Sequence, residues 1–148
     1  IGVSSFGFIN GHQYFNTPDI NEYNKQVESG KLPVWRAAKL TPRQNFERAV
    51  MFGLKSRGID KRTVEAKYER RVDAEYGGKI QKFIEIGLLE STSEHLRLTR
   101  LGELFAEEVC NHFVGEDVRK KANRTAMLVD PKNPIQRYNY NMIGHRLR

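Results

Sequence analysis

A helix-start signal at Thr41 places the strongest constraint on how this chain can fold. Thr41-Pro42-Arg43-Gln44 has the capping-box pattern, in which Thr and Gln each satisfy a free backbone N–H and proline suits the first helical position. Apolar residues then recur at helical spacing (Phe46, Ala49, Val50, Gly53 and Leu54), and Gly58 is expected to end the helix. The result is an amphipathic helix that needs a core to cover its apolar face.

The elements predicted after this helix supply that core. A short helix is expected from Asp60 to Tyr68, and another is expected to start at a cap on Asp73 and end at Gly87. Two short strands around a polar turn follow between Leu88 and Leu98. Thr99 is expected to cap one further helix whose apolar face holds Leu101, Leu104, Phe105, Val109, His112 and Phe113. This succession predicts a winged-helix-like module.

Upstream of the capping box, the sequence predicts a hairpin and one helix. Asn10-Gly11 is a strong hairpin signal, so residues 3–15 are expected to pair as two strands. Thr17 is expected to cap a helix that presents Ile20, Tyr23 and Val27 on one face and stops at Gly30. Lys31 to Arg36 is interpreted as an extended link, because Pro33 disfavours helix at the residue before it.

Composition narrows the class of protein. With 39% hydrophobic and 29% charged residues in 148, the chain is globular and has no apolar run long enough for a membrane helix. A single cysteine, Cys110, excludes an internal disulfide and a four-cysteine zinc site within this chain, and fits a reducing compartment such as the cytoplasm. Of the net charge of +7, +5 falls after Val114, which favours an anionic partner for a basic tail.

Several segments, taken in order, resemble the C-terminal region of the oxygen-independent coproporphyrinogen III oxidase (dehydrogenase) family of radical S-adenosylmethionine (SAM) enzymes. The matching segments are Gly2-Val3-Ser4-Ser5-Phe6-Gly7, Tyr14-Phe15-Asn16-Thr17, Tyr23 with Val27 to Gly30, Leu32-Pro33-Val34-Trp35-Arg36, Leu40-Thr41, Gly87-Leu88-Leu89, Leu98 to Gly102, Val109-Cys110 and Phe113. The resemblance covers roughly residues 1–114, and the order of the segments carries it.

The resemblance implies a larger enzyme. In that family an upstream barrel holds a [4Fe–4S] cluster on three cysteines together with SAM, and the C-terminal region closes the barrel mouth. The cluster cysteines are absent from this chain, so no catalytic residue or metal site is expected in it. The implied partners are the upstream barrel and a tetrapyrrole, which is coproporphyrinogen III, another tetrapyrrole or haem. Membrane binding is not expected, and nucleic acid is disfavoured.

The resemblance also nominates site residues. Gly2, Val3, Ser4, Ser5 and Phe6 are similar to the family's last-strand turn beside bound SAM, and the alternative is an ordinary strand end. Trp35 and Arg36 are the substrate candidates, because a guanidinium binds a propionate bidentately. The alternative favoured for this pair is a surface Arg beside a Trp packed on a helix.

Three further interpretations concern alternatives. A winged-helix-like nucleic-acid-binding module is the rival function, weakened because the helix from Asp73 to Ile86 carries three acids and only two bases. A protein-interaction domain without a ligand is a third hypothesis. Cys110 is interpreted as a buried structural thiol, and the spacing of the four histidines does not favour metal binding. An unpaired edge at residues 1–9 predicts self-association.

The expected fold class is therefore α+β and mainly helical. Residues 1–16 are assigned to the last strand or hairpin of an upstream barrel, and 17–40 to a helix and an extended linker. Residues 41–123 are assigned to the winged-helix-like C-terminal domain with its short hairpin, and 124–148 to a basic extended tail.

Overall fold

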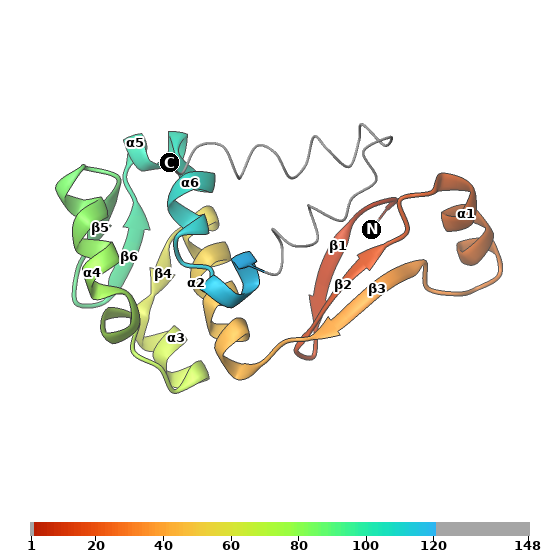
Figure 1. Ribbon diagram of the computed structural model, residues 1–148, viewed down its shortest axis with the longest axis horizontal. Coiled ribbons are helices and arrows are strands. Elements are labelled where there is room, and N and C mark those ends of the chain that lie inside the picture. The colour runs from red at the N-terminus through yellow and green to blue at the C-terminus, as the bar shows by residue number, and fades with distance from the viewer. Residues whose placement is uncertain (1, 121–148) are drawn as a thin grey trace. The chain divides into compact units, whose positions relative to one another are not determined.

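The computed structural model describes residues 2–120 and divides into two compact units, one up to Phe46 and one from Glu47 onward (Figure 1). The predicted tail at 124–148 lies outside the described residues. Among the helices described, none has both the length and the apolar character that crossing a membrane requires. The chain is a mixed helix and strand fold, as the sequence predicts.

The first unit is built on a three-stranded antiparallel sheet in the order β1-β2-β3 (Figure 1). β1 (Phe6–Ile9) and β2 (His12–Asn16) form the predicted hairpin. Its turn residues Asn10 and Gly11 have φ of 47° and 77°, the left-handed pair that suits this two-residue turn. The segment interpreted as an extended link continues as a third strand, β3 (Val34–Lys39), because the edge of β2 offers it backbone partners.

The N-cap of helix α1 (Ile20–Glu28) lies two residues later than predicted. Asp19, not Thr17, is the cap: its Oδ1 accepts from the N–H groups of Asn21 and Glu22 at 2.8 and 2.9 Å. The Thr17 hydroxyl instead accepts from the Asp19 N–H at 3.3 Å and shapes the turn before the helix. The helix ends before Gly30, which has φ of 73° as a stop residue does, and it buries no residue.

Helix α2 (Pro42–Ser56) confirms the capping box. The Thr41 N–H donates to Gln44 Oε1 at 3.0 Å, and the Gln44 N–H donates to Thr41 Oγ1 at 3.2 Å. Its predicted apolar positions Val50 and Leu54 are buried. Gly58 follows with φ of 86°, so the helix ends where the sequence predicts.

The second unit joins three short strands to packed helices. β4 (Ile59–Asp60), β6 (His95–Leu98) and β5 (Leu89–Ser91) form an antiparallel sheet in that order, and β5 and β6 are the predicted hairpin. α3 (Lys61–Tyr68) begins at Asp60, whose Oδ1 accepts from the Thr63 N–H at 2.7 Å. The buried apolar residues of this unit are Val50, Leu54, Ile59, Val72, Tyr76, Ile80, Leu89, Leu96, Val109, Cys110 and Phe113.

Two predictions for the helices of this unit are wrong in detail. α4 (Val72–Glu85) is not capped by Asp73; the Val72 N–H donates to Glu65 Oε1 of α3 at 3.0 Å, so a neighbouring helix satisfies its first turn. The helix after Thr99 is broken at Phe105 into α5 (Arg100–Leu104) and α6 (Ala106–Asn111). The break divides the predicted apolar face: Val109 and Phe113 are buried, whereas Leu101, Leu104 and Phe105 are exposed.

Candidate functional site

The turn at residues 2–6 is held by one buried side chain of β2. Asn16 Nδ2 donates to the Gly2 carbonyl at 2.9 Å and to Ser5 Oγ at 3.0 Å, and Ser5 Oγ itself donates to the Gly2 carbonyl at 2.8 Å. Gly2 has φ of 127° and Ser4 has φ of 58°, so the backbone here turns through the left-handed region. Chain neighbours aside, no atom of residues 2–120 lies within 4 Å of where a Gly2 side chain would start, so the described part of the chain leaves this backbone uncovered.

Trp35 lies at an irregularity of β3 and is not buried. Arg36 pairs with Phe15, but the next pair along β2 is Asn16 with Val34, so Trp35 is the extra residue of a bulge. The indole is 53% exposed, and Arg36 Cζ lies 3.8 Å from its ring centroid. The expectation of a Trp packed on a helix is therefore wrong: the bulge turns Trp35 out of the ladder, and a guanidinium covers its face.

The sheet brings the two sets of nominated residues together. Phe6 of the N-terminal turn lies opposite Phe15, and Phe15 lies opposite Arg36, so the three form one row across one face of the sheet. The rings of Phe6 and Phe15 are 6.1 Å apart, and both side chains are exposed. The row combines exposed aromatic surface with a guanidinium, an arrangement that suits an apolar group carrying a carboxylate.

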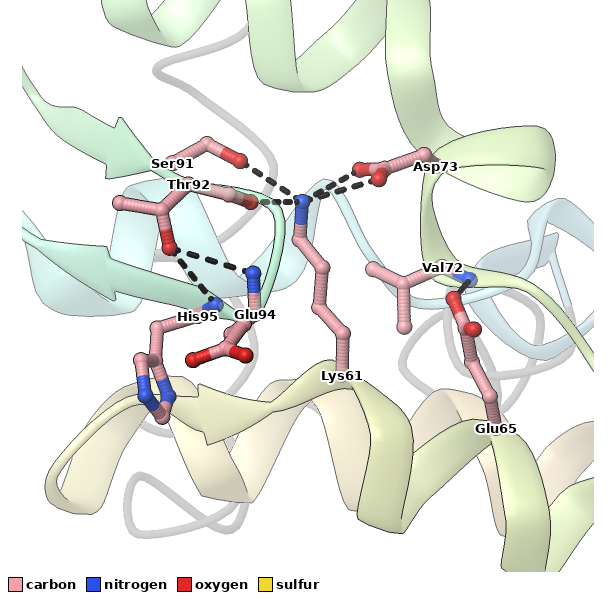
Figure 2. Close-up of polar contacts among 8 residues, drawn as sticks. All are labelled: Lys61, Glu65, Val72, Asp73, Ser91, Thr92, Glu94 and His95. Carbon is pink, nitrogen blue, oxygen red and sulfur yellow. Dashed lines mark hydrogen bonds and ion pairs between the residues drawn. The ribbon is translucent and has the colours of Figure 1, made fainter.

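In the second unit, the most connected polar group is a buried lysine that the sequence analysis missed. Figure 2 shows Lys61 extending from the start of α3 to a point between Asp73 of α4 and the hairpin residues Ser91 and Thr92. Its Nζ lies 2.8 and 2.9 Å from the two Asp73 carboxylate oxygens, 2.9 Å from Ser91 Oγ and 2.7 Å from the Thr92 carbonyl oxygen. With every N–H engaged, this ammonium joins α3, α4 and the hairpin and has no donor left for a ligand.

The turn beside Lys61 is fixed by the side chain of Thr92, one of the turn residues. Thr92 Oγ1 accepts from the Glu94 and His95 N–H groups at 3.2 and 3.0 Å (Figure 2). No spacing in the sequence marks Lys61 as buried, and its burial is a result of the fold. A buried ammonium needs a carboxylate partner. Asp73, which the sequence offered as a cap, is that partner.

The residues of this chain do not fit an iron–sulfur cluster. Cys110 is buried, and burial raises the pKa of its thiol to about 11, so the fold favours the neutral thiol over the thiolate that a cluster requires. Within residues 2–120 no three His, Cys, Asp or Glu side chains gather in a way that could hold a metal ion. Any cluster in a longer protein must therefore be ligated by other residues.

Two charged side chains of α4 make contacts within the second unit. Lys79 Nζ donates to the His112 carbonyl at 2.7 Å, which turns one of its two lysines toward α6 and away from a groove. Glu75 of the first turn pairs with Arg70 at 2.6 Å.

Comparison with known proteins relates part of the chain to one family. Residues 40–105 match the family model of the HemN C-terminal domain, and this segment of the chain belongs to that family. The resemblance to the C-terminal region of oxygen-independent coproporphyrinogen III oxidases is thereby confirmed.

The chain is similar to three particular proteins. It is 26% identical over 116 residues to "Heme chaperone HemW" of Bacillus subtilis, covering 78% of this chain and 31% of that protein. It is 28% identical over 117 residues to "Oxygen-independent coproporphyrinogen III oxidase" of Helicobacter pylori, covering 76% and 26%. A solved structure, titled "Coproporphyrinogen III oxidase (HemN) from Escherichia coli is a Radical SAM enzyme", shares the fold with a TM-score of 0.56 and 23% identity over 77% of this chain and 27% of that one. The chain thus spans about a third or less of the relatives it matches.

Proposed function

We propose that this chain is the C-terminal, substrate-positioning part of a radical SAM oxidoreductase that acts on coproporphyrinogen III or another tetrapyrrole by oxidative decarboxylation of propionates. An upstream barrel of the same protein is the proposed partner, holding the [4Fe–4S] cluster and SAM in a cytoplasmic enzyme. The observation that carries the proposal is the row formed by Phe6, Phe15 and Arg36 beside the open turn at residues 2–6.

In this proposal the two site segments have separate tasks. Gly2 to Phe6 lie beside bound SAM, where the open backbone allows close approach and Asn16 holds the turn in shape. Arg36 pairs with a propionate of the tetrapyrrole, and the Trp35 ring beneath its guanidinium keeps the fork in place. Aromatic surface around the ion pair excludes water and strengthens it.

The barrel supplies the radical chemistry in this proposal, and this chain supplies position and enclosure. We infer that the second unit is winged-helix-like, which the order α2-β4-α3-α4-β5-β6 supports. In this proposal the second unit does not bind nucleic acid, because the first turn of α4 carries the acidic residues Asp73 and Glu75.

The test compares Arg36 variants in the full-length protein that contains this chain, purified without oxygen and supplied with coproporphyrinogen III, SAM and a reductant. Arg36→Gln is expected to raise KM for the tetrapyrrole by about 10- to 100-fold, the effect of losing a hydrogen-bonded charge pair. Arg36→Lys is expected to restore it only in part, because a point charge does not replace the fork. Lys39→Gln, in the same strand, is the matched control and is expected to leave KM unchanged.

A second function is favoured by one of the relatives, whose name describes a heme chaperone. Under that alternative the full-length protein binds haem and forms no protoporphyrinogen. Measuring product and bound haem on the same preparation separates the two. Turnover that is the same in Arg36→Gln and in Lys39→Gln overturns the role proposed for the aromatic row.

A further inference from the structure

The opposite face of the same sheet holds a second feature, a groove that shares only Asn16 with the residues that the proposed function uses. It lies wholly within the first unit, encloses about 730 Å³, and is lined by strand residues including Tyr14 and Ala37, by α1 residues Tyr23 and Val27, and by the loop that carries Lys31 and Leu32. Tyr14 and Ala37 pair across β2 and β3 one register position away from Phe15 and Arg36, so they point to the other side.

Gly7 and helix α1 leave the space of this groove open. A side-chain carbon on Gly7 would overlap the Tyr14 ring, so the missing side chain lets this ring lie across β1 as a wall. Helix α1 buries none of its residues, although Tyr23 and Val27 belong to its apolar stripe. Val27 is 47% and Leu32 is 82% exposed, which leaves a rim of apolar surface with no protein atoms over it in the described chain.

The charge of the lining indicates what can occupy the groove. No Asp or Glu lines it, whereas Lys31 and His12 do. The Lys31 backbone N–H donates to the Gln26 carbonyl at 2.9 Å, but its ammonium has no ion-pair or hydrogen-bond partner among residues 2–120 and lies in the lining of this largely apolar groove. An occupant with an apolar body and a carboxylate satisfies both features, because the body covers the apolar rim and the carboxylate pairs with Lys31.

We propose that this groove binds a rigid, planar apolar molecule that carries carboxylates, of the size of a tetrapyrrole, at a site separate from the Arg36 row. The volume lies within the range of roughly 300–1,000 Å³ typical of small-molecule sites. Two tyrosine rings in the lining favour a flat partner over a flexible chain. The choice of a tetrapyrrole rests on the proposed function, but the groove and its charge do not.

The test measures binding of metal-free protoporphyrin IX to the 148-residue chain by porphyrin fluorescence anisotropy, in the dark and without SAM or reductant. Ala37→Phe fills the groove and is expected to weaken binding at least tenfold. Val27→Glu places a carboxylate on the exposed rim and is expected to do the same without burying anything, so the test stands even where Ala37→Phe fails to fold. Lys31→Gln is expected to weaken binding about fivefold, and Lys25→Gln on α1, outside the lining, is the matched control.

The carboxylate and the shape are tested by the choice of probe. The dimethyl ester of protoporphyrin IX is expected to bind the unchanged chain about as weakly as the free acid binds the Lys31→Gln variant. The Lys31→Gln change is expected to weaken binding of the ester only a little further, because the ester has no carboxylate to pair with Lys31. Dodecanoate is expected to compete poorly; displacement of the porphyrin by dodecanoate at equal concentration overturns the planar occupant.

The same titration separates this inference from the proposed function. Binding that is lost in Arg36→Gln and kept in Val27→Glu overturns the groove and leaves the proposed function standing. Binding that is lost in Val27→Glu while the full-length Arg36→Gln protein turns over normally supports the groove and overturns the role proposed for the row. Absence of any porphyrin binding overturns the groove site.

Discussion

Replacing Lys61 by Met is the sharpest test of how the second unit holds together. The side chain of Lys61 is 4% exposed, and methionine has a similar length without a charge. The change removes four contacts at once: two to Asp73, one to Ser91 Oγ and one to the Thr92 carbonyl oxygen (Figure 2). These contacts join α3 to α4 and to the β5–β6 hairpin, so their loss loosens the hairpin that completes the sheet.

The magnitude follows from what remains after the substitution. Removing one partner of a buried pair costs about 3–5 kcal/mol when the other charge stays buried. The Asp73 side chain is 49% exposed and regains water, so the expected cost of Lys61→Met is about 2–3 kcal/mol, mostly from unpaired Ser91 and Thr92 oxygens. Asp73→Asn is expected to cost about 1 kcal/mol, because its amide oxygen still accepts from Lys61. The double variant is expected to cost less than the sum.

Cys110 provides an assay that reports on this unit alone. Its thiol is fully buried, so 5,5′-dithiobis(2-nitrobenzoate) reacts with it only when the second unit opens, at a rate that follows the opening equilibrium. Lys61→Met is expected to speed the reaction roughly 30- to 150-fold. Arg62→Met, the next residue of the same helix, removes an exposed pair with Glu94 at 2.9 Å and is expected to change the rate by no more than about fivefold. A Lys61→Met rate within threefold of the Arg62→Met rate refutes the stabilising role.

Three further predictions concern particular contacts. Gly102→Ala places a side-chain carbon on the Leu88 carbonyl and is expected to lower the free energy of unfolding by about 2 kcal/mol or more. Gly77→Ala, in α4, has open space around the new carbon and is expected to raise the free energy of unfolding by about 0.5–1 kcal/mol. Urea titrations followed by circular dichroism compare the two variants. Thr99→Ala removes the cap that accepts from the Gly102 N–H at 2.9 Å and donates to the Gly87 carbonyl at 2.6 Å, for an expected loss of about 1–2 kcal/mol by the same titration, and Thr99→Ser is expected to keep most of it. Burial raises the pKa of Cys110 from 9.0 to about 11, so the fold favours the neutral thiol, and the stability that depends on this neutral form is complete below pH 9 and lost as the pH rises through 11. The urea midpoint is therefore expected to fall further between pH 8.5 and 11 in the parent chain than in Cys110→Ala. Equal falls in the two proteins would contradict the assignment.

Elements with a local cause were predictable from the sequence. Asn10-Gly11 sets its hairpin and Thr41 with Gln44 caps α2, because each signal acts through bonds between neighbouring residues. Elements with a tertiary cause were missed. Glu65 caps α4 from another helix, and no spacing within α4 announces it.

In the candidate site, too, the features that depend on tertiary pairing could not be predicted from the sequence. The bulge that turns out Trp35 depends on how β3 pairs with β2, a register that single-strand patterns do not encode. Asn16 was missed as the anchor of the N-terminal turn because its partners, Gly2 and Ser5, are brought to it by the hairpin. The resemblance nominated the residues, whereas the contacts between them follow from the pairing of the strands.

The sheet of the first unit explains why residues far apart in sequence act as one surface. A single change of pairing by one residue between β2 and β3 would move Arg36 to the side of Tyr14 and place Ala37 opposite Phe15. The Arg36 row and the groove therefore lie on opposite faces of the sheet because of one and the same register, which shifts only beyond Phe15, where Asn16 pairs with Val34. Asn16, the first residue beyond that shift, holds the turn at Gly2 and Ser5, so the strand that pairs with Arg36 through Phe15 also fixes the backbone of the N-terminal turn through its next residue.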